Sequence, residues 1–158
     1  MFVNGHIDGV TFRSLKHYHD PRGWLCELFR QDEMDAEFLP VMAYISMTLP
    51  WIARGPHEHR DQADYFCFIG PSNFALYMWD NRAASATYRN RCSRVVGSND
   101  PQAVIVPAGV VHAYKNIGSE PGIVFNAPNR LYRGPGRTEP VDEIRHEQDD
   151  KTVFSMDW

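Results

Sequence analysis

The sequence has little cysteine, little lysine and no long apolar run. Its three cysteines, Cys26, Cys67 and Cys92, are odd in number and far apart, which argues against a disulfide framework and against a CxxC metal or redox site. No apolar run approaches the roughly 20 residues of a membrane span, and the first residues lack the basic and apolar regions of a secretory signal. We therefore expect a cytoplasmic protein that has no membrane partner.

An excess of basic charge is also absent. The formal net charge is -4 at pH 7, whereas a nucleic-acid-binding face normally shows as a basic excess, so nucleic acid is not the expected partner. Only three of the 16 basic residues are lysine, and the other 13 are arginine. The forked guanidinium group suits phosphate or carboxylate on a small ligand, although genomic base composition produces the same bias.

Helical periodicity is nearly absent, which favours an all-β fold. Short β-branched and aromatic runs recur about every ten residues, separated by Gly, Pro, Asn and Asp, as in β-sandwiches and barrels. We expect one domain over residues 1–158, with a core at about 10–132 and a C-terminal extension at 133–158. The predicted strands are Val10–Leu15, Trp24–Phe29, Met42–Thr48, Tyr65–Ile69, Phe74–Trp79, Thr87–Ser93, Ala103–Val106, His112–Asn116 and Ile123–Asn126, and the one predicted helix is Gln31–Phe38.

The C-terminal extension is acidic until it closes with Phe154, Met156 and Trp158. It could be a solvated tail. Alternatively it packs over or beside the barrel, because a tryptophan side chain is costly to leave in water.

Two histidines, His57 and His59, lie two positions apart in the densest polar segment. In a strand these positions face the same side, so both rings would point into a barrel interior. Such a pair can ligate a divalent metal, or one ring can act as a general base. A polar surface turn is the third interpretation of this segment.

A second segment, Pro107–Asn116, reads PxGxxHxxxN and contains His112. Together with His57-x-His59, Asp64 and Gly70, it resembles the two halves of the cupin signature. The resemblance implies a jelly-roll barrel in which both segments line one cavity. It also implies an alternative in which His57, His59, Asp64 and His112 hold a divalent metal such as Fe, Mn, Ni or Zn.

Four ordered segments carry a closer resemblance: Asp20–Glu27 (DPRGWLCE), Arg54–His57 (RGPH), Asp80–Thr87 (DNRAASAT) and Val106–His112 (VPAGVVH). They resemble the dTDP-4-dehydrorhamnose 3,5-epimerase family of cupins. The resemblance implies a homodimeric isomerase that needs no cofactor or metal and acts on nucleotide-linked 4-keto-6-deoxy sugars in deoxysugar and polysaccharide biosynthesis.

The resemblance also assigns roles to residues. His57 is the base, and the carboxylate behind it is Asp149, with Asp150 close by. Arg54 holds phosphate or sugar oxygens, and a nucleotide contacts Arg22 and Glu27, with a dimer interface as one route. The catalytic set is thus His57, Asp149 and Tyr132, and the substrate-binding set is Arg22, Glu27, Arg54, His59, Asp64, His112 and Asn126.

Three positions depart from the family pattern. Asp64 stands where the family has a lysine that contacts the C4 oxygen, and Asn126 stands where it has the acid tyrosine, so Tyr132 or Tyr44 would be a substitute acid. His59 resembles the HxH of the related 3,4-ketoisomerases. The alternatives to an epimerase are therefore a ketoisomerase, a metal-dependent cupin enzyme, or a cupin that binds a sugar nucleotide without catalysis.

Overall fold

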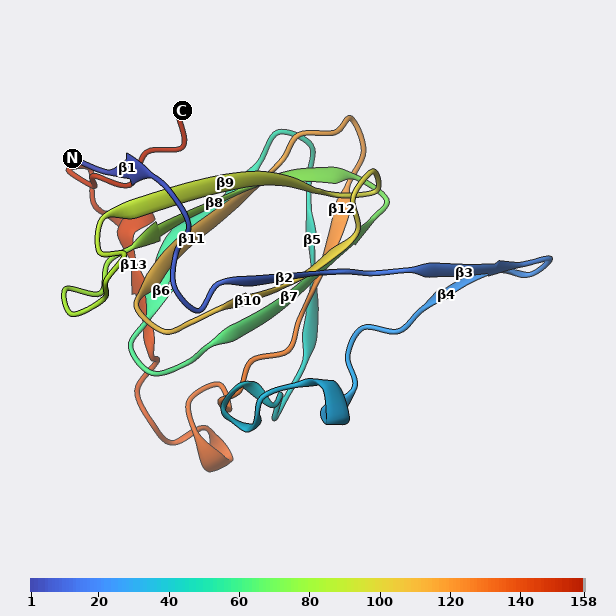
Figure 1. The fold of residues 1–158 in the computed structure, drawn as a ribbon, viewed down its shortest axis with the longest axis horizontal. Helices are drawn as coiled ribbons and strands as arrows, with labels where there is room; N and C mark the ends of the chain where they lie inside the picture. Colours follow the sequence, from blue (N-terminus) through green and yellow to red (C-terminus); the bar gives the residue numbers. More distant parts are fainter. Residues whose placement is uncertain (158) are drawn as a thin grey trace.

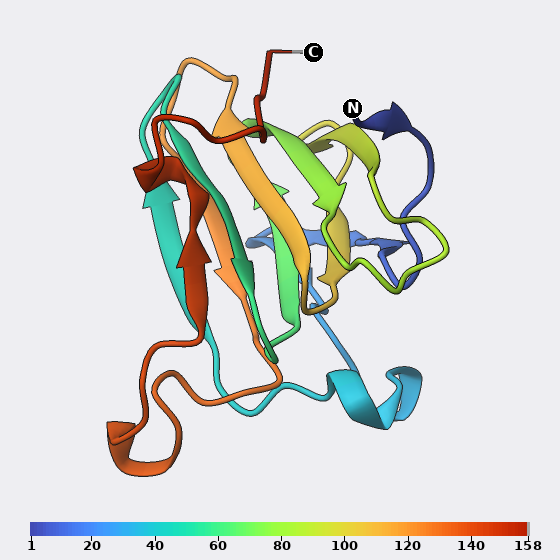
Figure 2. The ribbon, with the colours of Figure 1, turned by 90° about the vertical axis from the view of Figure 1, so that its left-hand side faces the viewer.

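Two facing β-sheets make up the body of the computed structural model, which describes residues 1–157 (Figures 1 and 2). The six-stranded sheet has the order β1-β9-β8-β11-β6-β13 and the five-stranded sheet the order β2-β10-β7-β12-β5. All pairings in them are antiparallel except that of β1 with β9. This confirms the predicted all-β, cupin-like jelly roll. No helix in the described part of the chain is long and apolar enough to cross a membrane.

The strands of the six-stranded sheet are β1 (Val3–Asn4), β6 (Ala53–His59), β8 (Asn73–Asp80), β9 (Asn90–Gly97), β11 (Val110–Asn116) and β13 (Glu143–Arg145). Those of the five-stranded sheet are β2 (Thr11–Ser14), β5 (Tyr44–Thr48), β7 (Asp64–Gly70), β10 (Gln102–Val106) and β12 (Gly122–Asn126). A separate hairpin consists of β3 (His17–Asp20) and β4 (Gly23–Cys26). Four 3-10 turns complete the elements: η1 (Gln31–Glu33), η2 (Ala36–Phe38), η3 (Pro135–Arg137) and η4 (His146–Gln148).

The core lies between the two sheets and follows from the two-residue period of the strands. On β8, Phe74, Leu76 and Met78 face inward and are fully buried, and they pack with Phe68 of β7 and Val104 of β10. Burial of each large side chain contributes about 1.5–3 kcal/mol. This apolar core leaves the polar side chains of the functional site grouped at one end of the barrel interior.

The connection between β8 and β9 is organised by one buried carboxylate. Asp80 accepts hydrogen bonds from the backbone and guanidinium of Arg82 and from the hydroxyls of Ser85 and Thr87. Burial alone would raise the pKa of Asp80, but these donors outweigh it and hold that pKa below its usual range. The DxRxxSxT segment therefore acts as a structural loop.

Two sequence expectations about local structure were wrong. The helix predicted over Gln31–Phe38 is two separate 3-10 turns, because Met34 between them is extended (φ -121°, ψ 141°). A segment this short is not stable as an isolated helix. The strand predicted from Thr87 begins instead at Asn90, because Arg89 takes a positive φ of 66° just before it.

The C-terminal extension packs beside the barrel. Its strand β13 pairs with β6 at the edge of the six-stranded sheet. Further on, Phe154 is 6% exposed and packs with Trp79, Val111 and Ala113 on the outer face of that sheet. The solvated-tail interpretation is therefore wrong for Phe154, and Trp158 lies outside the described residues.

The hairpin β3–β4 projects from the body of the molecule (Figure 1). Its apolar side chains Tyr18, Trp24 and Leu25 are 52%, 50% and 61% exposed. This segment therefore finds little cover within its own chain.

Candidate functional site

Strands β6 and β11 approach each other closely at the functional site. Their register places His57 opposite His112. Gly55, two residues before His57 on β6, has a φ of 81°. A Cβ atom at Gly55 would lie 2.6 Å from the carbonyl oxygen of His112. The glycine of the RGxH segment is thus required for the two histidine-bearing strands to pair.

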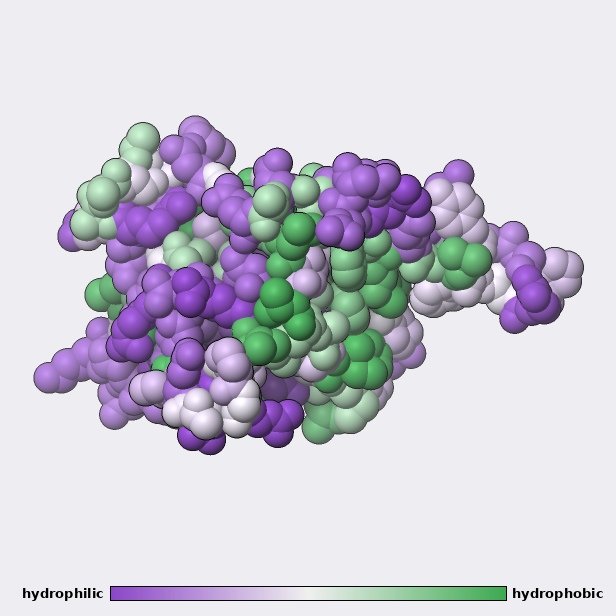
Figure 3. Space-filling model, turned by 90° about the horizontal axis from the view of Figure 1, so that it is seen from below, coloured by the Kyte–Doolittle hydropathy of each residue, from purple (hydrophilic) through white to green (hydrophobic). Residues whose placement is uncertain are grey.

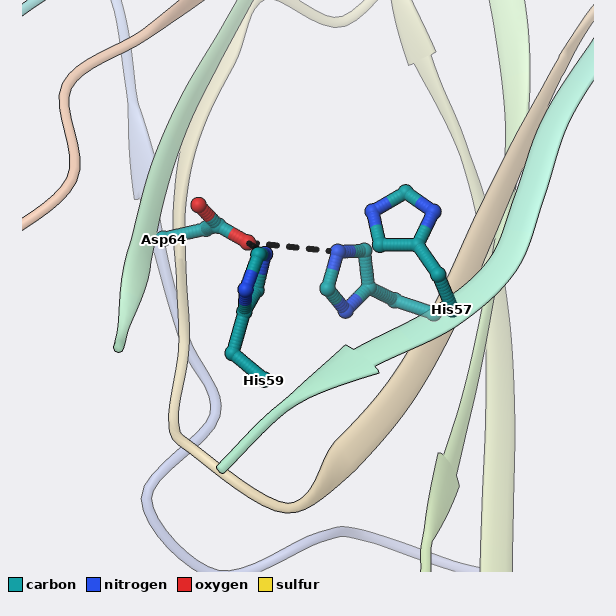
Figure 4. Close-up of side chains that lie close together, drawn as sticks. His57, His59 and Asp64 are labelled. Carbon is teal, nitrogen blue, oxygen red and sulfur yellow. Dashed lines mark ion pairs between the residues drawn. The ribbon is translucent and has the colours of Figure 1, made fainter. Parts of the chain in front are cut away.

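Four side chains from three strands converge inside the barrel. His57 and His59 come from β6, Asp64 begins β7 and His112 comes from β11. One ligand atom of each lies within 4.8 Å of the corresponding atoms of the others. Figure 4 shows His57 and His59 projecting from one strand and the carboxylate of Asp64 directed at the rings. The predicted shared face of the HxH pair is confirmed.

The two oxygens of Asp64 have different surroundings. Its Oδ1 accepts hydrogen bonds from the side-chain amides of Gln62 and Asn126, each at 2.9 Å. Its Oδ2 lies 3.2 Å from Nε2 of His59 and 3.3 Å from Nε2 of His112, but neither contact has hydrogen-bond geometry. The amides thus hold the carboxylate so that one oxygen faces the histidines.

Burial and neighbouring charge shift the pKa values of Asp64 and His59 in opposite directions. Burial would raise the pKa of Asp64, but His112 and His59 hold that pKa well below its usual range. Burial would lower the pKa of His59, yet Asp64 raises it overall. Asp64 is therefore an anion that lies 2% exposed.

His57 has a different carboxylate beside it. Its Nε2 lies 3.9 Å from Oε1 of Glu143 on β13. Burial lowers the pKa of His57 to about 2, with a further contribution from His112, so the ring is neutral in the free protein and keeps a nitrogen lone pair.

Asp149, the carboxylate expected from the sequence, does not lie behind His57. It is exposed at the end of η4, and its side chain accepts a hydrogen bond from the backbone of Lys151. Asp150, which follows it, is exposed as well. Glu143 lies beside His57 instead. The short strand β13 pairs with β6, and their register places Glu143 opposite His59.

A cavity of about 1890 Å³ opens beside the four-residue cluster. Six arginines line it: Arg54, Arg60, Arg130, Arg133, Arg137 and Arg145. Among the described residues, no carboxylate forms an ion pair with Arg60 or Arg137. Arg54 is held by hydrogen bonds to the hydroxyl of Thr48 and the carbonyl of Met47. The cavity wall can therefore accept an anionic ligand larger than a single sugar.

Three tyrosines also line the cavity: Tyr44, Tyr132 and Tyr114, whose hydroxyl is hydrogen-bonded to that of Ser46. The hydroxyl of Tyr44 accepts a hydrogen bond of 2.8 Å from the amide of Asn126. Burial, followed by the charge of Asp64, raises the pKa of Tyr44 to about 12. Tyr132 is on the loop after β12 and is 54% exposed. Asn126 therefore joins Asp64 to Tyr44 in one network.

Two expected nucleotide contacts are not brought to the cavity within one chain. Arg22 is at the tip of the hairpin β3–β4, where it pairs with Asp20 and its side chain is 90% exposed. Glu27 follows β4 and is also exposed.

Sequence reasoning missed Glu143, Gln62 and the arginines that follow β12. The dense run of arginines over 130–137 was a usable signal for the cavity wall. Glu143 carried no such signal, because β13 is only three residues long.

Comparison with known proteins gives consistent matches along the chain. The profile of the dTDP-4-dehydrorhamnose 3,5-epimerase family matches residues 4–136. The Probable low-salt glycan biosynthesis epimerase Agl13 of Haloferax volcanii is 36% identical over 129 residues, which cover 80% of this chain and 81% of that protein. The Spore coat polysaccharide biosynthesis protein SpsL of Bacillus subtilis is 29% identical over 153 residues, 96% of each chain. The crystal structure of a dTDP sugar isomerase from Desulfovibrio desulfuricans superposes with a TM-score of 0.81 at 20% identity, over 94% of this chain and 91% of that one.

Proposed function

The chain belongs to the dTDP-4-dehydrorhamnose 3,5-epimerase family and is an isomerase of the epimerase type, and we propose that it inverts C3, C5 or both in a nucleotide-linked 4-keto-6-deoxy sugar. The observation that carries this proposal is the position of His57, a neutral imidazole in the wall of a large arginine-lined cavity.

The chemistry follows from the ketone. A carbonyl at C4 acidifies the hydrogens on C3 and C5, because loss of either proton gives an enolate. His57 takes the proton from the carbon, and the electron pair moves into the enolate. Glu143, at 3.9 Å, stabilises the imidazolium that forms. In this role Glu143 replaces Asp149.

Inversion requires a proton from the opposite face of the sugar ring. We assign this role to Tyr44, whose hydroxyl stays protonated and is held by Asn126. The Tyr44 hydroxyl gives its proton to the carbon as the enolate returns to the ketone. His57 then releases its proton to solvent, and solvent restores the proton on Tyr44. Tyr132 is the second candidate, because it lines the same cavity from a more exposed loop.

The arginines of the cavity account for the nucleotide. A diphosphate linker carries negative charge that guanidinium groups bind with forked hydrogen bonds. Arg60 and Arg137 have no ion-pair partner within residues 1–157, so both are open to such a ligand. Arg54, which is already fixed by Thr48 and Met47, would hold the sugar end near His57.

A homodimer would bring the projecting hairpin into use. The five-stranded sheet carries apolar residues on its outer face, including Phe125 on β12 and Ile45 and Met47 on β5, which are 67% and 55% exposed. Figure 3 shows apolar residues gathered on the face seen from below, and a small apolar group on the arm that projects. Large exposed apolar surface of this kind marks an interaction site. We propose that a second copy covers it and that its hairpin carries Arg22 and Glu27 toward the nucleotide.

The proposed function is tested by incubating the enzyme with dTDP-4-keto-6-deoxyglucose and recording the NMR couplings of the sugar ring. We expect new couplings that correspond to inversion at C3, C5 or both. A keto group shifted to C3 would indicate a ketoisomerase instead. Binding of the sugar nucleotide without any conversion would contradict an enzymatic role for this ligand.

A further inference from the structure

The geometry points to a divalent transition-metal ion held by His59, Asp64 and His112, with His57 left free for proton transfer. The family resemblance implies a metal-free reaction. The arrangement of these donors instead favours metal binding, through the tautomer of His112, the spacing of the donor atoms, their burial and the support behind Asp64. The inference concerns a binding site and does not depend on which sugar is bound.

The first reason is the tautomer of His112. Its Nδ1 lies 3.0 Å from the carbonyl oxygen of Val110, and a carbonyl can only accept, so Nδ1 carries the proton. In the neutral ring, Nε2 then bears a lone pair, and this atom lies 3.3 Å from the carboxylate of Asp64. Two electron-pair donors this close are stabilised when a cation, either a proton or a metal ion, lies between them. Donation of the second ring nitrogen to a backbone carbonyl is also typical of metal-binding histidines.

The second reason is the spacing of the donor atoms. Two ligands bound at about 2.1 Å from one ion lie about 3.0–3.4 Å apart in octahedral or tetrahedral geometry. Oδ2 of Asp64 lies 3.3 Å from Nε2 of His112 and 3.2 Å from Nε2 of His59. This Nε2 also has the side-chain amide of Gln62 at 3.2 Å, a contact that a bound ion would replace. Both donor pairs that include Asp64 therefore already have the separation that a bound ion would impose, and the ligand atoms of the whole cluster lie within 4.8 Å of one another.

The third reason is the burial of unsatisfied atoms. Asp64 is 2% and His112 is 1% exposed, and neither Oδ2 of Asp64 nor Nε2 of His112 has a hydrogen-bond partner within the described chain. Buried charges are normally paired or bound to metal. An ion at this point would satisfy both atoms at once.

The fourth reason is the support behind the carboxylate. The amides of Gln62 and Asn126 both donate to Oδ1 of Asp64, which leaves Oδ2 to face the histidines. Hydrogen-bonded carboxylates of this kind are typical of metal ligands. Two imidazoles and one carboxylate suit ions such as Fe²⁺, Mn²⁺ and Zn²⁺ and leave positions open for a substrate oxygen.

His57 is close to this group but is turned to a different partner. One of its ring nitrogens belongs to the same 4.8 Å cluster, and its Nε2 lies 3.9 Å from Oε1 of Glu143. We therefore assign three protein ligands. When bound, the ion would supply positive charge that stabilises a developing negative charge on a substrate oxygen.

Metal binding to the full chain without substrate tests this proposal. Protein is stripped with a chelator and titrated calorimetrically with Zn²⁺, and Co²⁺ is added in parallel to record its visible absorption. We expect about one ion per chain, and binding at least about a hundredfold weaker in His59→Gln and Asp64→Asn. His57→Gln and His146→Gln are the matched controls and are expected to keep the stoichiometry and the Co²⁺ spectrum.

Three results would overturn the proposal: no Zn²⁺ binding by the folded wild type, unchanged binding in a folded His59→Gln variant, or loss of the ion in His57→Gln. Circular dichroism of each stripped variant separates lost binding from lost folding. Because no sugar is present, a failure of the epimerase proposal leaves this result unaffected.

Discussion

Nε2 of His57 lies 3.9 Å from Oε1 of Glu143, a contact between β6 and a three-residue strand in the C-terminal extension. The extension therefore contributes to the functional site as well as to the packing of the barrel. We propose that this contact, rather than one with Asp149, stabilises the protonated form of the base.

Replacement of Glu143 is expected to slow catalysis. Glu143→Gln keeps the size of the side chain but removes the charge that stabilises the imidazolium of His57, so kcat should fall about ten- to a hundredfold while KM changes little. Steady-state kinetics measure both. Asp149→Asn serves as the matched control. A larger fall in kcat in that variant would show that Asp149, as expected from the sequence, is the carboxylate that supports His57.

The roles of Tyr44 and Tyr132 can be distinguished by removing one hydroxyl at a time. Tyr44→Phe should lower kcat by about a hundredfold or more, because it removes the proposed proton donor and leaves the ring in place. Tyr132→Phe should keep most of the activity. Equal activity of Tyr44→Phe and the wild type would reject Tyr44 as the acid, and a selective loss in Tyr132→Phe would assign that role to Tyr132.

The buried loop around Asp80 is expected to give the fold part of its acid sensitivity. The hydrogen bonds lower the pKa of this carboxylate in the folded state, so its stabilising effect is complete above the unfolded pKa of about 4 and is lost as the pH falls through the lower, folded value. Asp80→Asn should cost about 2–4 kcal/mol at pH 7.

Urea unfolding at pH 7 and near pH 3 measures this effect. The wild type should lose more stability between the two conditions than Asp80→Asn does, because the variant lacks the group that titrates. Asp150→Asn, at an exposed position, should lose as much stability between the two conditions as the wild type does. An identical acid loss in the wild type and Asp80→Asn would show that the Asp80 network does not contribute.

The projecting hairpin is expected to hold a dimer together. Trp24→Ser combined with Leu25→Ser removes two half-exposed apolar side chains from β4, and should weaken dimerisation at least about a hundredfold in sedimentation equilibrium. Val153→Ser, which is exposed but far from the hairpin in sequence, is the control. A monomeric wild type would refute the dimer, and an undisturbed dimer of the double variant would place its interface elsewhere.

Local pattern was enough to predict the all-β class and the shared face of His57 and His59, because a two-residue period directly determines which side chains face inward. It did not give β1, β3, β6 or β13 among the predicted strands. The position of Glu143 depended on long-range pairing, because Glu143 reaches the site through the β13–β6 register. No local signal carries such a contact. Gln62 is only two residues before Asp64, and its hydrogen bond to that carboxylate depends on the side-chain conformations at the end of β6 and the start of β7. The helix predicted over Gln31–Phe38 was wrong for a different reason. The composition of this segment permits a helix, but the segment is too short to be stable as one.

Exchange of hydrogen with solvent tests the central claim most directly. The sugar nucleotide is incubated in D₂O with wild type, His57→Ala or His6→Ala, a variant at an exposed surface histidine, and deuterium at C3 and C5 is followed by NMR. The account predicts exchange with the wild type and His6→Ala, and a loss of at least about a hundredfold with His57→Ala. Undiminished exchange with a folded His57→Ala enzyme would contradict it.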